Sequence, residues 1–564
     1  MSSKRQKQGA AWMAVALTMG LALAGCGQGG NTTGTPAATT GPIEGGSIVL
    51  DTDSNFKDFD PALAYFVTDT EVVPQIYEQL VTYQGASTNI VGLLAQSWDV
   101  SKDGKTYTFH LRKGVKFTNG DAMTAQSFID EFERVLGKGG VNSPGEGFID
   151  PVVVGATAYH NLKNKTGQHV SGITTPDPYT LRIQLNQPQA YFLEVLAMPF
   201  FSAVDQKYID QVGNATFDSS KMMGTGPFLA SQINANGVVL KKNTAYWNKD
   251  KNGNALPYLD QVKIRINKND QVDTLNFQQG QTALLGWAIN GIPSDSIPKF
   301  RTDPTLKKTM QTFPENANYY LGMNVKTGPF TNHNLRLAME YAINKTKLAQ
   351  LSAGKDIPAN QDIPPAIPGH VKNLPAEVNY TYDPNKAKQL LAAAGYKPGQ
   401  LTVTLTSQNS GLAPKWDQSI QYDLQQVGIN CKINMLNNNT FYTEAMAGSL
   451  TLFVAGWYQD FPDPYDFLML LATNQAPSNN MTWYSNAQVD AWLQQLNTST
   501  NTQQRMTLSK NITVQFLKDA PWVPLCFSNA VYAIQPWVHG YYFSPALGDP
   551  LQYMWIDKGH SQTG

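Results

Sequence analysis

Cysteine and charged residues are scarce in this chain of 564 residues. Cysteine occurs only at positions 26, 431 and 526, and Asp, Glu, Lys and Arg together make up 15% of the residues, against about a quarter in an average soluble domain. The 42 basic residues do not outnumber the 43 acidic ones. Because a nucleic-acid-binding protein usually has a basic excess, we expect no nucleic acid partner.

The motifs that mark common catalytic and metal sites are also missing. The chain has no CxxC, no HExxH, no GxSxG and no phosphate-binding glycine loop. Its seven histidines, at positions 110, 160, 169, 333, 370, 539 and 560, are scattered without the spacing of a metal site. We therefore expect each histidine to be solvated or part of the core, and predict no cofactor and no metal site.

The N-terminal segment has the order of features found in secretion signals. Lys4, Arg5 and Lys7 precede an uncharged stretch, residues 9–25, that is rich in Ala, Leu and Met and too short to favour a membrane span. The stretch ends in Leu-Ala-Gly before Cys26, whose thiol can carry a thioether-linked lipid. We predict a signal peptide at residues 1–25 and lipidation of Cys26. The alternative is a plain signal peptide that is cut nearby.

A linker and a large folded body follow. Residues 26–42 contain no charge and no large apolar side chain, so they are predicted to be a flexible linker rather than part of a core. Residues 1–25 hold three of the basic residues and none of the acidic ones, which leaves 39 basic and 43 acidic residues, a net charge of −4, in the other 539. This length predicts two or three domains.

Cys431 and Cys526 lie in apolar runs typical of strands, at residues 429–435 and 523–527. The two could form one disulfide. Two buried thiols fit such runs better, and this is the interpretation we favour.

Residues 106–136 predict a strand followed by a helix. In residues 106–112, Tyr107, Phe109 and Leu111 alternate with polar residues, the pattern of a half-buried strand. Thr124 can then cap a helix whose large apolar residues recur at helical spacing up to Leu136. This block is α+β.

Residues 383–455 predict strands that alternate with helices. Helices are expected after the Asp383-Pro384 pair, at 415–427 and at 440–447, and strands at 401–405, 429–435 and 450–455. Such alternation favours a largely parallel sheet with helices on its faces. Ligands collect at the carboxyl ends of such strands. The aromatic and acidic segment 456–465, GWYQDFPDPY, is expected to be a loop at that end.

In five stretches of its sequence the chain resembles a known family, the bacterial extracellular solute-binding proteins of family 5. This family includes dipeptide- and oligopeptide-binding lipoproteins of ABC importers. Residues 93–136, LLAQSWDVSKDGKTYTFHLRKGVKFTNGDAMTAQSFIDEFERVL, look like the family's signature region. Four further stretches agree in order and spacing: GTGPFLASQINANGVVLKKNTAYWN (224–248), LRLAMEYAINKTKLA (335–349), AGWYQDFPDPYDFL (455–468) and APWVPLCFSNAVYA (520–533). The resemblance spans almost the whole chain after the linker.

The resemblance implies an α/β fold of two lobes joined by a hinge, with an additional α+β domain on the N-terminal lobe. It implies that lobe I comprises residues 43–66, 186–285 and 521–564. The extra domain would take residues 67–185 and lobe II residues 286–520. Closure of the lobes on a ligand would be a hinge motion.

The resemblance also implies a ligand site. In peptide-binding members, an Asp in the loop after the Gly-Trp pair contacts the α-ammonium of the peptide, and flanking backbone pairs with the peptide as an added strand. In this chain the Asp is Asp460. The backbone and wall of the site are Gly456, Trp457 and Tyr458, and the matching stretch of lobe I holds Tyr65 and Phe66.

Several of these residues also have a purely structural interpretation. Asp460 could be an exposed loop acid, and Trp457 could belong to the core at the edge of the lobe. Asp463 before Pro464 is expected to be a turn former that bonds its own backbone. Trp98 and Trp247 are expected in the core.

The sequence as a whole predicts a lipid-anchored receptor, monomeric and not an enzyme, that binds short peptides and delivers them to the permease subunits of an ABC importer. Its membrane attachment would be the lipid on Cys26. Three alternatives keep the fold and change the ligand to an oligosaccharide, a nickel chelate or haem. An anchored hydrolase is a further alternative, although no local nucleophile or metal constellation supports it.

Overall fold

The computed structural model describes residues 41–288, 291–544, 546 and 548–562. The predicted signal peptide, Cys26 and the linker up to residue 40 lie outside these residues. Residues 42–564 form one unit by their internal contacts, and that unit is described here by itself. No helix among the described residues has both the length and the apolar character needed to cross a membrane.

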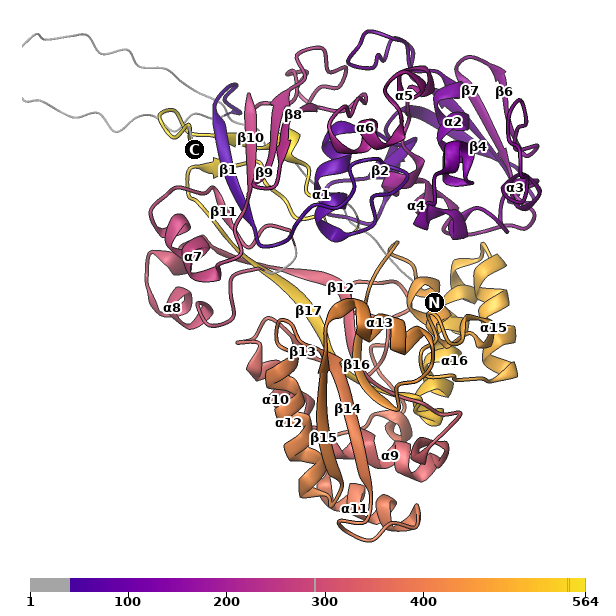
Figure 1. Cartoon of the computed structure of the whole chain (residues 1–564), viewed down its shortest axis with the longest axis vertical. Helices are drawn as coiled ribbons and strands as arrows, with labels where there is room; N and C mark the ends of the chain where they lie inside the picture. Colours follow the sequence, from indigo (N-terminus) through magenta and orange to yellow (C-terminus); the bar gives the residue numbers. More distant parts are fainter. Residues whose placement is uncertain (1–40, 289–290, 545, 547, 563–564) are drawn as a thin grey trace, which may run out of the picture. The chain divides into compact units, whose positions relative to one another are not determined.

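One large mixed sheet runs through the unit (Figure 1). Its strand order is β15-β14-β16-β12-β17-β11-β1-β10-β9-β8, and β13 pairs with β17. The strands are β1 (Ser47–Thr52), β8 (Phe228–Asn234), β9 (Gly237–Lys242), β10 (Gln261–Ile266), β11 (Leu284–Leu285), β12 (Met310–Met323), β13 (Ile357–Pro358), β14 (Thr402–Gln408), β15 (Asn430–Leu436), β16 (Leu452–Tyr458) and β17 (Trp522–Ile534).

The prediction of a largely parallel sheet is right for three strands and wrong for their neighbours. β14 pairs in parallel with β15 and β16, as the alternation of strands and helices indicates. β12 pairs antiparallel with both β16 and β17. β12 lies before the alternating segment in the chain and β17 after it, so the local pattern carries no information about their direction.

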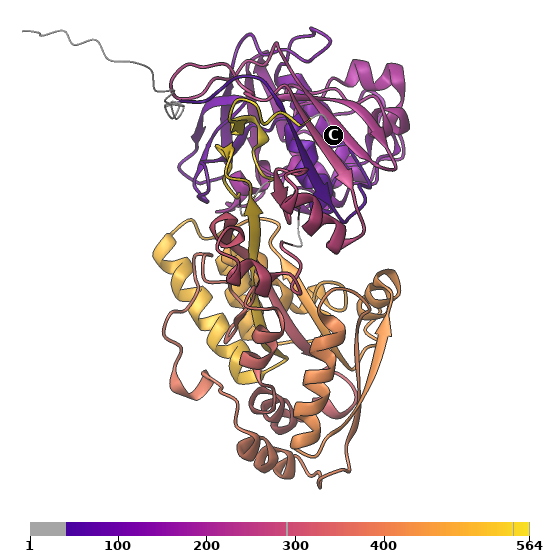
Figure 2. The same cartoon turned by 90° about the vertical axis from the view of Figure 1, so that its left-hand side faces the viewer.

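Helices cover both faces of the sheet around β16. Because side chains alternate along a strand, Leu452 and Val454 pack in one apolar cluster with Trp416 of α12 (Ala413–Gln426). Phe453 and Ala455 pack in another cluster with helices α13 (Asn438–Met446), α15 (Ala487–Thr498) and α16 (Thr502–Asp519). Figure 2 shows strand β17, in yellow, running between the indigo-to-magenta elements and the orange elements.

The predicted helices and strands of residues 383–455 are confirmed to within about three residues. The helices of the unit are α1 (Val67–Ile76), α2 (Ala125–Val135), α3 (Ala156–His160), α4 (Phe192–Leu196), α5 (Gln206–Val212), α6 (Asn214–Ser219), α7 (Asp270–Gln278), α8 (Ile297–Thr302), α9 (His333–Ala342), α10 (Lys345–Leu351), α11 (Pro384–Ala393), α12 (Ala413–Gln426), α13 (Asn438–Met446), α14 (Pro464–Leu468), α15 (Ala487–Thr498) and α16 (Thr502–Asp519). Asp383 caps α11 by accepting hydrogen bonds from the N–H groups of Asn385 and Lys386.

A separate four-stranded sheet has the order β4-β5-β7-β6. It consists of β4 (Ala95–Val100), β5 (Thr106–Leu111), β7 (Thr180–Gln184) and β6 (Ile173–Asp177). The predicted alternation is confirmed, since Tyr107, Phe109 and Leu111 are buried in one core with α2. Trp98 and Trp247 pack against this core but remain half-buried. Short pairs β2 (Val81–Tyr83) with β3 (Ile90–Gly92), and β18 (Val538–His539) with β19 (Trp555–Ile556), complete the strands.

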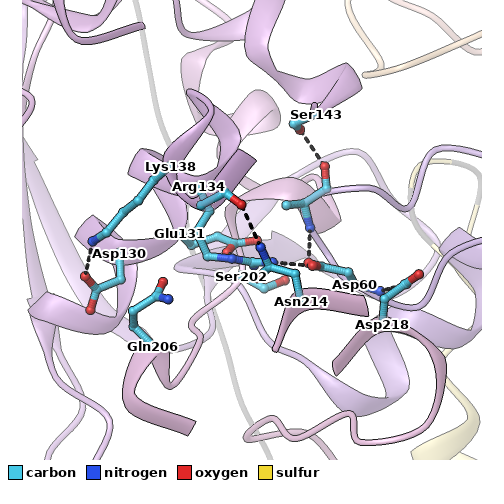
Figure 3. A network of polar contacts seen from close by, with 12 residues as sticks. Asp60, Asp130, Glu131, Arg134, Lys138, Ser143, Ser202, Gln206, Asn214 and Asp218 are labelled. Carbon is cyan, nitrogen blue, oxygen red and sulfur yellow. Dashed lines mark hydrogen bonds and ion pairs between the residues drawn. The ribbon is translucent and has the colours of Figure 1, made fainter. Parts of the chain in front are cut away.

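A buried network of ion pairs joins helix α2 to Asp60, in the segment between β1 and α1 (Figure 3). The guanidinium of Arg134 on α2 contacts the carboxylate of Asp60 and, at 2.6 Å, that of Glu131. All three side chains are almost fully buried. Asp218 accepts the N–H of Asp60 at 2.7 Å. The network therefore ties together segments that are more than 150 residues apart in sequence.

Both cysteines of the described residues are buried and unpaired. Cys431 lies in β15 and Cys526 in β17, as the apolar runs indicate. This confirms two buried thiols rather than a disulfide. The domain limits expected from the resemblance stay a prediction.

Candidate functional site

Strand β16 carries the predicted backbone of the site. It was expected to end at Ala455, but it continues through Gly456, Trp457 and Tyr458, so these three residues are not in the loop. The reason is the long strand β12 beside it, whose Ala317 pairs with Tyr458. The pairing goes one residue further, because the N–H of Gln459 donates to the carbonyl of Asn316 at 3.0 Å.

The other edge of β16 is open where the site is expected. β14 pairs with β16 only at Leu452 and Phe453, so among the described residues no strand pairs with residues 454–458 on that side. The register with β12 directs the N–H and C=O of every second residue to this open edge. Gly456 is required in this stretch, because a Cβ there would lie 2.7 Å from the ring of Tyr319 and 2.8 Å from the carbonyl of Asn318.

Asp460 lies two residues after the end of the strand and is half-buried. Its N–H donates to Oδ2 of Asp466 at 2.9 Å, which fixes the turn. Its Oδ1 accepts the hydroxyl of Tyr65 at 3.0 Å, from a residue 395 positions earlier in the chain. None of the ion pairs between described residues includes Asp460.

Burial dominates the electrostatics of this carboxylate. It raises the pKa of Asp460 to about 7, and the hydrogen bond from Tyr65 offsets only part of that shift. The neighbouring Asp466 is fully buried, and burial together with the charge of Asp460 raises its pKa well above the ordinary value. Burial therefore disfavours the charged form of both acids.

Trp457 and Tyr458 flank the carboxylate in different ways. The indole N–H of Trp457 donates to Oδ2 of Asp466 at 3.3 Å, and the ring packs against the core on that face. Tyr458 is 38% exposed, and its hydroxyl lies 3.1 Å from that of Tyr319. Trp457 therefore stabilises the turn through Asp466, while the ring of Tyr458 remains accessible to solvent.

Tyr65 and Phe66 precede helix α1, and the structure brings only one of them to Asp460. Both side chains are exposed, Tyr65 by 43% and Phe66 by 51%. Tyr65 bonds Asp460 and lies beside the ring of Phe200, with 6.0 Å between centroids. Phe66 instead lies 5.0 Å from the ammonium of Lys57.

Sequence reasoning missed Phe461, the residue after the predicted anchor. Its ring is 2% exposed and stacks on Tyr191 with 4.5 Å between centroids. It belongs to the apolar core of α2 and the four-stranded sheet rather than to the clusters around β16. No local pattern reveals such a contact, because Tyr191 lies 270 positions away.

The expectation for Asp463 is confirmed. Its carboxylate accepts the N–H of Tyr465 at 2.8 Å and so caps α14. It also accepts two hydrogen bonds of 2.5 Å from the guanidinium of Arg505. Asp463 is therefore a structural residue that holds the turn after Asp460.

Two cavities elsewhere do not include these residues. One, of about 400 Å³, is lined in part by Lys345, Ile357, Tyr382 and Phe527. A smaller one, of about 80 Å³, is lined in part by Glu78. The candidate site is defined by the open strand edge and the carboxylate of Asp460.

Comparisons with known proteins identify the family of this chain. Residues 89–479 match the model of bacterial extracellular solute-binding proteins, family 5. Heme-binding protein A of Haemophilus influenzae is 30% identical over 526 residues, which cover 88% of this chain and 90% of that protein. Di/tripeptide-binding protein 1 of Pseudomonas aeruginosa is 27% identical over 88% of this chain and 92% of its own length.

Solved structures give the same result for the fold. The ABC transporter-associated periplasmic binding protein DppA of Helicobacter pylori, solved with the peptide STSA, superposes with a TM-score of 0.75 at 27% identity, covering 92% of this chain and 99% of that one. The murein tripeptide binding protein MppA of Escherichia coli has a TM-score of 0.77 at 24% identity, covering 91% and 99%. The predicted two-lobed fold class is thereby confirmed, and the chain belongs to the bacterial extracellular solute-binding proteins of family 5.

Proposed function

We propose that this protein is an extracytoplasmic receptor that binds short peptides through their free N-terminus and delivers them to an ABC importer. The observation that carries the proposal is Asp460. This half-buried carboxylate lies at the end of an open strand edge, and no cation from the described residues pairs with it.

An α-ammonium group complements this carboxylate. Burial raises the pKa of Asp460 to about 7 because few groups nearby stabilise its charge. A ligand cation that hydrogen-bonds the carboxylate would restore that stabilisation inside a site shielded from water. Binding would therefore favour ligands with a positively charged terminus.

The open edge of β16 supplies the second half of recognition. A peptide laid along residues 454–458 can pair with their free N–H and C=O groups, an interaction that is blind to side chains. Gly456 keeps this edge close to β12, and the exposed ring of Tyr458 offers a wall to the ligand. One site of this kind accepts many peptide sequences.

The names of the relatives support a peptide ligand. They include the di/tripeptide-binding protein and the dipeptide-binding protein DppE of Bacillus subtilis, and DppA was solved with a peptide. Heme-binding protein A makes haem the alternative ligand. A haem ligand would leave the raised pKa of Asp460 without a role.

The attachment and assembly expected from the sequence complete the proposal. A lipid on Cys26 would hold the monomeric receptor at the outer side of the cell membrane, next to the permease subunits. The proposed domains of the receptor are lobe I (43–66, 186–285 and 521–564), the extra domain (67–185) and lobe II (286–520).

The lipid anchor can be tested by replacing Cys26 with Ser. This change should release the protein from the membrane fraction, and retention there would refute the anchor.

The ligand can be identified by native mass spectrometry of the purified protein, followed by titration calorimetry with the peptides found. We expect a ladder of short peptides with free N-termini. The variant Asp460→Asn should bind them at least about 30-fold more weakly, since removing one partner of a buried charge pair typically costs 2 kcal/mol or more.

A matched control is Asp99→Asn, which removes an exposed carboxylate from the four-stranded sheet. It should leave affinity unchanged. Equal affinity of wild type and Asp460→Asn would refute the role of Asp460. A co-purifying sugar, haem or metal chelate would refute peptides as the ligand.

A further inference from the structure

Three metal-ligating side chains meet outside the candidate site. They are Glu146, Asp150 and His160, and one ligand atom of each lies within 4.8 Å of the others. Nδ1 of His160 is 3.6 Å from Oε1 of Glu146 and 4.0 Å from Oδ2 of Asp150. The side chain of His160 is 36% exposed, as expected for a solvated histidine, and it lies beside two acids.

The backbone holds these residues in place. The carbonyl of Glu146 accepts the N–H of Asp150 at 2.9 Å, so the two carboxylates lie one helical turn apart on the same face. Ile149 and Val153, next to them, are almost fully buried in the core. The three residues therefore lie in one segment, residues 146–160, that is packed against the core.

A further bond fixes the histidine relative to the acids. The hydroxyl of Thr157 in α3 donates to the carbonyl of Asp150 at 2.9 Å, so α3, which ends at His160, is tied to the turn. The ammonium of Lys165 donates to the carbonyl of His160 at 2.9 Å and closes the end of that helix.

The ring nitrogen of His160 that faces the acids has no hydrogen-bond partner. Nδ1 is shielded from solvent although the side chain as a whole is 36% exposed, and 3.6 Å is too long for a hydrogen bond to Glu146. A buried nitrogen without a partner is costly.

A divalent cation would satisfy all three groups together. Two ligands that each lie about 2.0–2.2 Å from a tetrahedral Zn²⁺ are separated by about 3.3–3.6 Å, so the observed 3.6 and 4.0 Å need to close by only a few tenths of an ångström. One imidazole and two carboxylates suit Zn²⁺ better than the all-oxygen sites preferred by Ca²⁺ and Mg²⁺.

We propose that Glu146, Asp150 and His160 bind one Zn²⁺ ion, with water as the fourth ligand. All three ligands lie in residues 146–160, and Asp460 is not among them, although Phe148 of that segment contacts the ring of Phe461, with 6.3 Å between centroids. The affinity for Zn²⁺ falls with acidification, because the imidazole and both carboxylates must be deprotonated to bind the metal.

The test is titration calorimetry with zinc chloride on protein that carries no histidine tag and has been stripped with a chelator. We expect one Zn²⁺ per chain. His160→Ala and Asp150→Asn should each lower the affinity at least about 100-fold, since even the loss of an outer-shell partner costs 10–100-fold. Circular dichroism melting in the absence of metal shows whether each variant is folded.

A matched control is His110→Ala. His110 is also exposed and lies 2.9 Å from a single carboxylate, that of Asp99, so it tests whether any histidine–carboxylate pair binds zinc. It should keep wild-type affinity. The proposal is overturned if wild type shows no saturable site, or if folded His160→Ala and Asp150→Asn bind Zn²⁺ as wild type does.

Discussion

Peptide affinity should fall steeply as the solution becomes acidic, because Asp460 must be ionised to pair with an ammonium. Its pKa in the ligand-free protein is raised to about 7. The ionised fraction is then about 0.76 at pH 7.5 and about 0.03 at pH 5.5, which predicts a loss of affinity of about 25-fold. The peptide α-amino group, with a pKa near 8, limits affinity on the alkaline side.

The raised pKa of Asp460 also makes the stability of the fold depend on pH. The folded pKa of Asp460 exceeds that of an unfolded aspartate, so the ligand-free fold is more stable when this acid is protonated and loses that contribution as pH rises towards 7. A bound ammonium removes the penalty. Peptide should therefore raise the melting temperature more at pH 7.5 than at pH 5.5.

Titration calorimetry at several pH values between 5.5 and 7.5 measures the affinity directly. Asp460→Asn should bind weakly at every pH and should lose the slope, because an amide does not titrate in this range. A wild-type affinity that changes less than about threefold over the range, or a slope that persists in Asp460→Asn, would refute the reasoning.

Three further outcomes follow from buried side chains. Arg134→Leu should lower the free energy of unfolding by about 3–5 kcal/mol in urea titrations, because it leaves the buried carboxylate of Asp60 without its cation. Phe461→Ala should cost a similar 3–5 kcal/mol in the same assay, because the ring is 2% exposed and fills a core. Cys431 and Cys526 should react with a thiol reagent only after unfolding, since burial raises the pKa of Cys431 to about 11 and that of Cys526 further.

Exposed side chains provide the controls. Lys415→Met removes a cation from an ion pair with Asp295 in which both side chains are exposed, by 51% and 88%, and Phe66→Ala removes a ring that is 51% exposed. Both should cost less than about 1 kcal/mol. Equal losses in Arg134→Leu and Lys415→Met would contradict the burial argument. Rapid reaction of either thiol in the native protein would contradict the placement of the cysteines.

Local sequence patterns predicted local structure well. The alternation of Tyr107, Phe109 and Leu111 became strand β5, and the Asp383-Pro384 pair became the start of α11. The direction of β12 and β17 and the extension of β16 to Tyr458 could not be predicted, because both depend on pairing between distant segments. Strand pairing is set by the whole fold rather than by a window of residues.

The same limit applies to the candidate site. The resemblance identified Asp460 and Tyr65, and the structure joins them by a hydrogen bond. The resemblance did not indicate Asp466, Phe461 or the group around His160. Asp466 acts through a backbone N–H and an indole, and Phe461 through a ring far away in sequence. Only the spacing of Glu146 and Asp150, one helical turn apart, was visible in the sequence.

One comparison tests the central claim most directly: the affinity of the wild-type protein for a single short peptide with a free N-terminus and for the same peptide after N-terminal acetylation. Calorimetry at pH 7.5 should show that acetylation weakens binding by at least about 30-fold, because it removes the charge that pairs with Asp460. Equal affinity for the two peptides would contradict the account.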